Sequence, residues 1–276
     1  MAFYQERVAP RIGRGDRATL ELSDWAARGE QLVRKHGTHA ISFERDGIWV
    51  DDGDGSQWLY TPGVPGSALW TEFGSPHEQE EVRLLAERLP EGGVFVDAGA
   101  NAGSHCVKLA QQRPDLRVIV FEPAAAAFET LLRNAERNGV AERIDASRLA
   151  LWDRDTALSL TTRLQGENFV VPSSAGSSSE ATESVEAKTL DGLLSGRDRV
   201  DAIKCDVEGA ELAVLNGAAI TLERFHPILL IEIEERHTRR YGHSAEEVFD
   251  LLAAHGYRHE PVGEGRNFLF SAQPAG

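Results

Sequence analysis

The sequence is poor in cysteine, in basic residues and in long hydrophobic runs, and each shortage excludes a class of protein. The two cysteines, Cys106 and Cys205, lie within predicted core elements, so we expect two buried, reduced thiols and not a disulfide or a metal pair. Lys and Arg number 29 against 44 Asp and Glu, the formal net charge is −15, and no dense basic run is present. Such a chain repels polyanions, so we expect no nucleic-acid partner and no membrane partner.

The apolar runs are also too short for a membrane. No stretch approaches the ~20 residues that a helix needs to cross a bilayer. The N-terminus lacks the order of a secretion signal, in which a basic segment precedes an apolar one. We therefore expect a cytoplasmic protein.

The 276 residues, 41% of them hydrophobic, suit one large domain or a domain with an appendage. We expect residues 1–74 to form an N-terminal appendage and residues 75–276 to form the main domain. The appendage begins with a weakly patterned segment that has helix-compatible spacing over residues 16–35. Alternating apolar and polar residues between 40 and 60, around an Asp46-Gly47 turn, then predict β-hairpins whose aromatic side chains serve packing.

Strand and helix patterns alternate from residue 75 onward, which is typical of a parallel sheet with helices on both faces. Pro76 is expected to begin a helix with a capping box of Ser75 and Glu78, and Ser244 with Glu247 is expected to cap a later helix. Strands are expected at residues 94–97, 117–122, within 144–152, 202–207 and 228–234, with a closing antiparallel hairpin at 257–262 and 267–270. Further segments predict an extra pair of strands at 157–163 and 185–188, and a Ser-rich loop at 172–179 that serves as a linker or as a lid.

The turn after the first strand indicates which cofactor the sheet holds. A dinucleotide site would have the pattern Gly-x-Gly-x-x-Gly, whereas this chain has Asp97-x-Gly99-x-Asn101-x-Gly103. The two glycines and the asparagine tolerate left-handed backbone angles. A carboxylate at the start of the turn repels a pyrophosphate but suits a ligand with a positive charge, such as an amino group or a sulfonium. This favours S-adenosylmethionine.

Two more positions complete the predicted cofactor site. Glu122 ends the second strand, 19 residues past Gly103, where a carboxylate can accept both ribose hydroxyls. The end of the third strand, around Ala150, is expected to contact the adenine. The alternative is that Asp97 and Glu122 are merely solvated strand ends.

Several short segments in this order are typical of one enzyme family. They are residues 95–103 (FVDAGANAG), 121–123 (FEP) and 203–211 (IKCDVEGAE), supported by 74–78 (GSPHE), 189–191 (TLD), 214–217 (VLNG) and 227–232 (PILLIE). Together they resemble the signatures of FkbM-type methyltransferases over about residues 70–234. The resemblance implies a class I, Rossmann-like methyltransferase fold: a doubly wound, mostly parallel, seven-stranded sheet that binds S-adenosylmethionine. It further implies methylation of a hydroxyl on a sugar, polyketide or other secondary metabolite, and it places Glu78 on the cofactor side.

The segment 203–209 indicates where the chemistry occurs. Asp206 and Glu208 lie two apart near the end of the fourth strand and are expected to point to one side, with Lys204 on the opposite side. Methylating an alcohol requires a group that removes its proton. Asp206 is the first candidate, as base or as the residue that orients one, and it also counts among the cofactor-side residues. Glu232 and His237 are the second and third candidates.

The same carboxylates allow other roles. Asp206 could only cap the turn after its strand. With Glu208 and Glu232 it could hold a divalent cation, but no histidine-spaced metal motif accompanies them, so a metal is not favoured. Glu234 adds a fourth carboxylate, and all four are expected to converge on one rim.

The sequence as a whole favours an S-adenosylmethionine-dependent O-methyltransferase that acts on a small hydroxylated molecule. N-methylation, methylation of a lipid or glycan, and a non-catalytic S-adenosylmethionine-binding module are the alternatives. A module that only binds has no need of an acidic rim. The identity of the acceptor, and whether the protein forms a homo-oligomer, cannot be read from the sequence.

Overall fold

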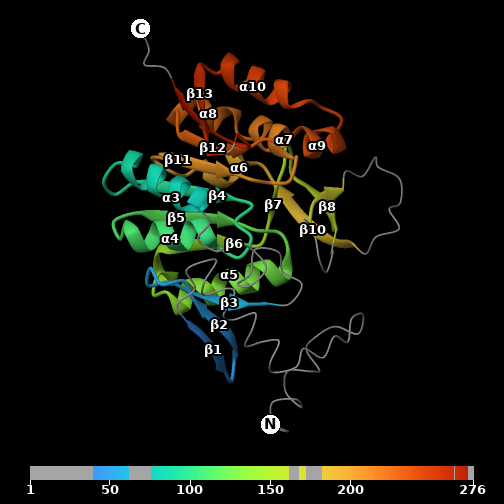
Figure 1. Cartoon of the computed structure of the whole chain (residues 1–276). Helices are drawn as coiled ribbons and strands as arrows, with labels where there is room; N and C mark the ends of the chain where they lie inside the picture. The colour runs from blue at the N-terminus through green and yellow to red at the C-terminus, as the bar shows by residue number, and fades with distance from the viewer. Residues whose placement is uncertain (1–39, 62–75, 162–167, 172–181, 264, 273–276) are drawn as a thin grey trace.

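The computed structural model describes residues 40–61, 76–161, 168–171, 182–263 and 265–272 (Figure 1). The helix expected over residues 16–35, the cap Ser75 and the Ser-rich loop 172–179 lie outside these ranges. Both cysteines are buried and neither forms a disulfide, as expected. Within the described ranges, no helix combines the length and the apolar character that crossing a bilayer requires.

A seven-stranded sheet forms the centre of the molecule. Its strands in spatial order are β13 (Tyr257–Val262), β14 (Asn267–Ala272), β12 (Ile228–Glu232), β11 (Ala202–Cys205), β4 (Val94–Ala98), β5 (Arg117–Phe121) and β6 (Ile144–Ser147). Six strands run in one direction and β14 runs in the opposite one, so the predicted mostly parallel sheet is confirmed. The chain order reverses at β4, and a sheet of this kind binds its ligand at that switch point, outside the carboxyl ends of the strands.

Helices cover both faces of this sheet (Figure 1). One face packs against α3 (Pro76–Arg88), α4 (Ser104–Gln112) and α5 (Ala125–Arg137); the other packs against α6 (Leu190–Leu194), α7 (Glu211–Asn216), α8 (Ala219–Phe225) and α10 (Ala245–Ala254). Alternation along β4 explains the two layers, because Phe95 belongs to the first buried cluster while Val94 and Val96 belong to the second. The expected capping box between Ser244 and Glu247 begins α10.

A second, four-stranded sheet lies beside the carboxyl ends of the central strands (Figure 1). Its strands are β7 (Ala150–Leu151), β10 (Thr182–Lys188), β8 (Thr156–Thr161) and β9 (Val170–Val171). The antiparallel pairing of β8 with β10 confirms the predicted extra strands. The segment expected to hold the third strand supplies strands to both sheets, because β6 pairs with β5 whereas β7 pairs with β10.

A third sheet packs on the outside of α5 (Figure 1). It is the antiparallel sheet of β1 (Ala40–Glu44), β2 (Gly47–Asp51) and β3 (Gln57–Tyr60), which confirms the predicted hairpins. Trp58 is fully buried in the same cluster as Val107 and Leu131, so its role is packing, as expected. The N-terminal sheet therefore shares a core with α4 and α5.

Candidate active site

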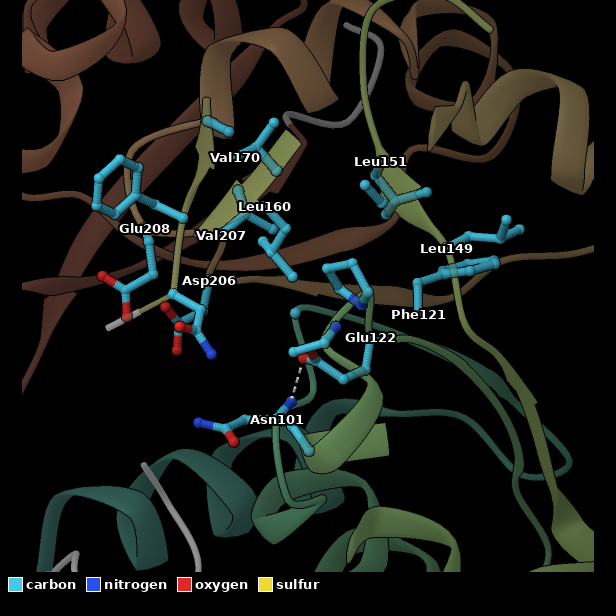
Figure 2. A pocket seen from close by; sticks show the side chains of 18 of the residues that line it. Asn101, Phe121, Glu122, Leu149, Leu151, Leu160, Val170, Asp206, Val207 and Glu208 are labelled. Atoms are coloured by element: carbon cyan, nitrogen blue, oxygen red, sulfur yellow. Dashed lines mark hydrogen bonds between the residues drawn. The ribbon is translucent and has the colours of Figure 1, made fainter. Parts of the chain in front are cut away.

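A pocket lies where the carboxyl ends of β4, β5 and β11 meet the four-stranded sheet (Figure 2). Five predicted site residues line it together: Gly99, Asn101, Glu122, Ala150 and Asp206. Apolar side chains, among them Phe121, Leu149, Leu151, Leu160 and Val170, form much of its wall. In Figure 2, Leu149 and Leu151 stand on one side of the pocket and Asp206 and Glu208 on the other. The pocket is thus apolar towards β7 and acidic towards the end of β11.

The turn after β4 is shaped by backbone conformation. Gly99, Asn101 and Gly103 all have positive φ values, of 79°, 51° and 89°. A Cβ at Gly99 would overlap the carbonyl oxygen of Asp206, so the turn can pack against the end of β11 only with glycine there. The predicted pattern of two glycines around an asparagine therefore has a geometric cause. Gly103 itself is not among the residues that line the pocket.

Glu122 is buried and fixes this turn. One carboxylate oxygen accepts a hydrogen bond from the amide of Asn101 and the other from the amide of Ala124, each at 2.8 Å; Figure 2 draws the first (Figure 2). Burial raises the pKa of Glu122 to about 7, although these two amides oppose the shift. A carboxylate oxygen has two lone pairs, so both oxygens keep acceptor capacity towards the pocket. Its contact with a ribose stays a prediction.

Asp97 is fully buried and does not line the pocket. The adjacent Cys106 thiol is a weak donor, and neither carboxylate oxygen has a stronger hydrogen-bond partner among the described residues. Lys204 sits opposite Asp97 in the register of β11 and β4. Unsatisfied buried acceptors fit a ligand that brings a positively charged donor, as S-adenosylmethionine does. The contact of Asp97 with the cofactor nevertheless stays a prediction.

Lys204, which is buried, forms a cluster next to the pocket with Asp206 and Glu232, which are half-buried. The Lys204 Nζ lies 3.0 Å from Asp206 Oδ2. The expectation that Lys204 points to the opposite side is wrong, because its ammonium pairs with Asp206 just beyond the end of the strand. The two carboxyl groups are hydrogen-bonded to each other, and Asp206 lines the pocket while Glu232 does not.

The two acids of the cluster, Asp206 and Glu232, have pKa values shifted in opposite directions. Burial and then the charge on Asp206 raise the pKa of Glu232 to about 9. Burial alone would raise the pKa of Asp206 as well, but the Lys204 ammonium and the hydrogen bond with Glu232 outweigh it and lower that pKa. At neutral pH the pair therefore consists of an ionised Asp206 and a protonated Glu232.

The strand β11 ends at Cys205. Asp206 and Glu208 were expected near the end of this strand, but they belong to the turn that follows it. Glu208 has a left-handed φ of 57°, and its Oε2 lies 3.3 Å from Nδ1 of His237. Glu208 lines the pocket, whereas His237 is buried and does not. His237 therefore lies behind Glu208, a residue that lines the pocket.

Glu211 holds this turn, a role that the sequence analysis missed. Its Oε1 accepts hydrogen bonds from the amides of Val207 and Gly209, at 3.3 and 2.9 Å. Burial raises its pKa to about 7. The available signal was a carboxylate two residues after a glycine, because a carboxylate at that spacing can accept the amides of a tight turn.

The remaining acidic candidates lie away from the pocket. Glu78, on α3, accepts a hydrogen bond from Oγ of Ser104 at 3.4 Å and is not a lining residue. Glu234 pairs with Arg236 and, at 3.0 Å, with Arg266, so the fourth carboxylate of the expected rim is neutralised there. In the described part of the chain, no three His, Cys, Asp or Glu side chains are grouped as a metal site.

Comparison with known proteins supports the family that these residues resemble. The profile of the methyltransferase FkbM domain matches residues 97–259, which is more than half of the chain. The chain belongs to the FkbM methyltransferase family. This family assignment implies the use of S-adenosylmethionine. The matched segment begins at Asp97 and contains the whole turn of residues 97–103, hereafter the cofactor turn, and the cluster around Asp206. It contains neither Glu78 nor the N-terminal sheet.

Individual relatives share less than a third of their residues with this chain over the matched segments. The methyltransferase sdnD of Sordaria araneosa is 31% identical over 159 residues, which cover 47% of this chain and 61% of that protein. The hexuronic acid methyltransferase AglP of Haloferax volcanii is 29% identical over 170 residues, which cover 60% of this chain and 66% of that protein. The chain thus spans less than two thirds of either relative. A crystal structure of methyltransferase FkbM from Methylobacillus flagellatus KT shares 21% identity at a TM-score of 0.45 and covers 65% of this chain and 43% of that one.

Other residues of the FkbM signatures support the fold. Asp191 caps α8, since its Oδ1 accepts hydrogen bonds from the amide and the hydroxyl of Thr221, both at 2.7 Å. A Cβ at Gly217 would overlap the carbonyl oxygen of Trp152, so glycine permits the close approach of those two segments. These signature residues act through structure and not through the pocket.

Proposed function

We propose that the protein is an S-adenosylmethionine-dependent O-methyltransferase that acts on a hydroxyl of a small molecule, such as a sugar, a polyketide or another secondary metabolite. One observation carries this proposal: Asp206 lines the pocket and its Oδ2 lies 3.0 Å from the Nζ of Lys204. The Lys204 ammonium and Glu232 both lower the pKa of Asp206, which favours its ionised form. A charged carboxylate beside a cofactor site is a group that can take a proton from an alcohol.

The cofactor is proposed to occupy the part of the pocket that β4, β5 and β7 form. Gly99 and Asn101 supply backbone there, Glu122 would accept the ribose hydroxyls, and Ala150 with its apolar neighbours would contact the adenine. Asp97 is proposed to hold a positive group of the ligand from beneath the turn. When bound, S-adenosylmethionine supplies a methyl group on a sulfonium centre, which is electrophilic.

Asp206 is proposed as the general base. The hydroxyl proton of the acceptor passes to Asp206 as the oxygen is methylated, which leaves a neutral carboxyl group that Glu232 continues to contact. Lys204 keeps Asp206 ionised until that moment. General-base catalysis of this kind contributes about 10²–10⁴ in rate. His237 is proposed to act only by holding Glu208 at the acidic side of the pocket.

The charge of the pocket narrows the proposed acceptor. Asp206 and Glu208 both face it, and the whole chain carries a formal charge of −15. A carboxylate-bearing acceptor would be repelled by these groups. We therefore propose a neutral hydroxylated acceptor, in contrast to the hexuronic acid in the name of the relative from Haloferax volcanii.

The division of the chain into an appendage of residues 1–74 and a methyltransferase domain of residues 75–276 is likewise a proposal. The buried cluster that Trp58 shares with α4 and α5 supports a view in which the N-terminal sheet and the domain act as one body.

Two measurements test the function. Isothermal titration calorimetry with S-adenosylhomocysteine should detect binding to the full chain. Incubation with S-adenosylmethionine carrying a tritiated methyl group, and with a panel of neutral glycosides and hydroxylated polyketides, should label an acceptor oxygen, and mass spectrometry locates the label. No binding of S-adenosylhomocysteine would refute the proposal, and label on a nitrogen would replace O-methylation by N-methylation.

A further inference from the structure

The N-terminal sheet is hydrogen-bonded to the cofactor turn through one side chain. Asn134, on α5, is fully buried. Its Oδ1 accepts a hydrogen bond from the amide of Leu59 in β3 at 2.8 Å. Its Nδ2 donates one to the carbonyl oxygen of Ala102, also at 2.8 Å. Ala102 lies between Asn101 and Gly103, so a single amide group joins the outer sheet to the turn that shapes the pocket.

Both hydrogen bonds of Asn134 join protein groups directly, from a fully buried side chain. A buried donor or acceptor that loses its partner costs its full desolvation free energy, which exceeds the net contribution of an ordinary hydrogen bond to stability. Breaking either hydrogen bond of Asn134 is therefore unfavourable. The residues on either side of Ala102, Asn101 and Gly103, both have left-handed backbone. Such a conformation persists only when its surroundings fix it.

The sheet at the other end of this bond is itself anchored. Lys108, on α4, is buried and pairs with Asp52 at 3.0 Å and with Asp54 at 2.8 Å, both in the loop between β2 and β3. Ser56 donates to Gln111 at 2.8 Å. The helix α4 begins directly after the cofactor turn, so the sheet also holds the element that follows Ala102.

Asn138 provides a natural contrast one helical turn later. Its Oδ1 accepts from the amide of Gln57 in the same strand at 2.8 Å, and its Nδ2 donates to the carbonyl oxygens of Gln57 and Asn134, at 2.7 and 2.8 Å. Its Oδ1 also accepts a hydrogen bond from Nε2 of Gln111 on α4, at 3.3 Å. Asn138 is half-buried and binds the same strand with the same chemistry, but its bonds do not reach the cofactor turn.

We propose that Asn134 is a positioning residue through which the N-terminal sheet sets the affinity of the pocket for its cofactor. This inference rests on the proposed function only in taking S-adenosylmethionine as the ligand of the turn. It gives residues 40–60 a task at the cofactor end of the pocket.

Matched variants of the full chain test the proposal. Asn134→Asp keeps an acceptor for Leu59 but replaces the donor to Ala102 by an oxygen that repels it; Asn138→Asp makes the same change away from the turn. By calorimetry, Asn134→Asp should raise the Kd for S-adenosylhomocysteine about tenfold, a typical size for coupling between sites, and Asn138→Asp by less than about twofold. A thermal melt of each variant gives its loss of stability. Equal Kd values for the two variants, or a rise that follows the loss of Tm in both, would overturn the proposal.

Hydrogen exchange in the unaltered protein gives a second test that does not depend on a variant folding. Because coupling is reciprocal, S-adenosylhomocysteine bound at the turn should slow exchange of the Leu59 amide by about tenfold and leave the Gln57 amide nearly unchanged. Equal slowing of both amides, or of neither, would contradict the inference. Failure of the unaltered protein to bind S-adenosylhomocysteine would be a different result, since it would refute the proposed function itself.

Discussion

The two halves of the pocket are built on different principles. At the ends of β4 and β5 the shape comes from backbone: Gly99 and Asn101 have positive φ values, and Glu122 is hydrogen-bonded to two backbone amides. At the ends of β11 and β12 side chains face one another: Lys204 pairs with Asp206, which is hydrogen-bonded to Glu232. The first half has a fixed backbone shape that suits ligand binding, and the second half carries side chains that can hold and transfer a proton.

This difference teaches that binding and chemistry can be separated in this chain. A change at the end of β4 should affect the affinity for the cofactor or the stability of the turn. A change at the end of β11 should affect the rate and its dependence on pH. Each prediction below either breaks that separation or sharpens it.

The largest effect is expected at Asp206. Asp206→Asn removes the proposed base while it keeps the volume of the side chain, so kcat for methyl transfer should fall by about 10²–10⁴. The Kd for S-adenosylhomocysteine should change by less than about threefold. Tritium transfer to an acceptor found in the panel measures the first quantity and calorimetry the second. Full activity in this variant would remove Asp206 from the mechanism.

The next largest effect is expected at Gly99. In Gly99→Ala the new Cβ meets the Asp206 carbonyl oxygen, and left-handed backbone adds about 1–2 kcal/mol. Gly92→Ala is the matched control, because Gly92 has a φ of 64° and open space around its Cβ position. Urea unfolding should show a larger loss of stability for Gly99→Ala, with weakened binding of S-adenosylhomocysteine. Equal losses in both variants would mean that close packing is not what glycine provides there.

A shift in pH dependence is expected at Lys204. Its ammonium lowers the pKa of Asp206, so Lys204→Met should raise that pKa and move the acid limb of the kcat/KM profile upward by about 1 to 2 pH units. Lys188→Met serves as control, since Lys188 pairs at the surface with Asp155 at 3.1 Å. An unmoved acid limb in Lys204→Met would show that a different group limits the rate at low pH.

The smallest effect is expected at Glu211, in stability alone. Its pKa is about 7 in the folded protein, against 4.5 for an ordinary Glu. Between these values the folded state keeps a proton that the unfolded state has lost, so stability falls as pH rises from 4.5 to 7. Glu211→Gln keeps an acceptor for Gly209 but does not ionise, and its Tm should fall less between pH 5 and 8. An identical fall in both proteins would exclude Glu211 as the cause.

The strands and helices of the central sheet could be predicted because their patterns are local. Buried runs such as residues 94–97 and the capping box at Ser244 depend on near neighbours in sequence, and both were found where expected. The location of the site could also be predicted, because the carboxyl ends of parallel strands meet at one edge of the sheet.

Contacts between distant segments could not be predicted. The hydrogen bond between Asp206 and Glu232, and the bridge of Asn134 between Leu59 and Ala102, depend on strand register and helix rotation, which no short motif encodes. The sequence also predicted that Asp206 lies on the strand. Glutamate seldom adopts a left-handed backbone, so the turn formed by Glu208 could not be foreseen from its residue type. Local chemistry thus identified the residues, and the fold decided which of them touch.

The most direct test of the separation between the two halves is one calorimetric comparison that needs no acceptor. Glu122→Gln and Asp206→Asn each replace a carboxylate by an amide of the same size, one in each half of the pocket. The account predicts that Glu122→Gln raises the Kd for S-adenosylhomocysteine about tenfold or more, because an amide replaces a buried acceptor that holds two backbone amides and is proposed to accept hydrogen bonds from the ribose. Asp206→Asn should leave that Kd within about threefold of the unaltered protein. The reverse order, with weak binding in Asp206→Asn and unchanged binding in Glu122→Gln, would contradict the assignment of binding to the ends of β4 and β5.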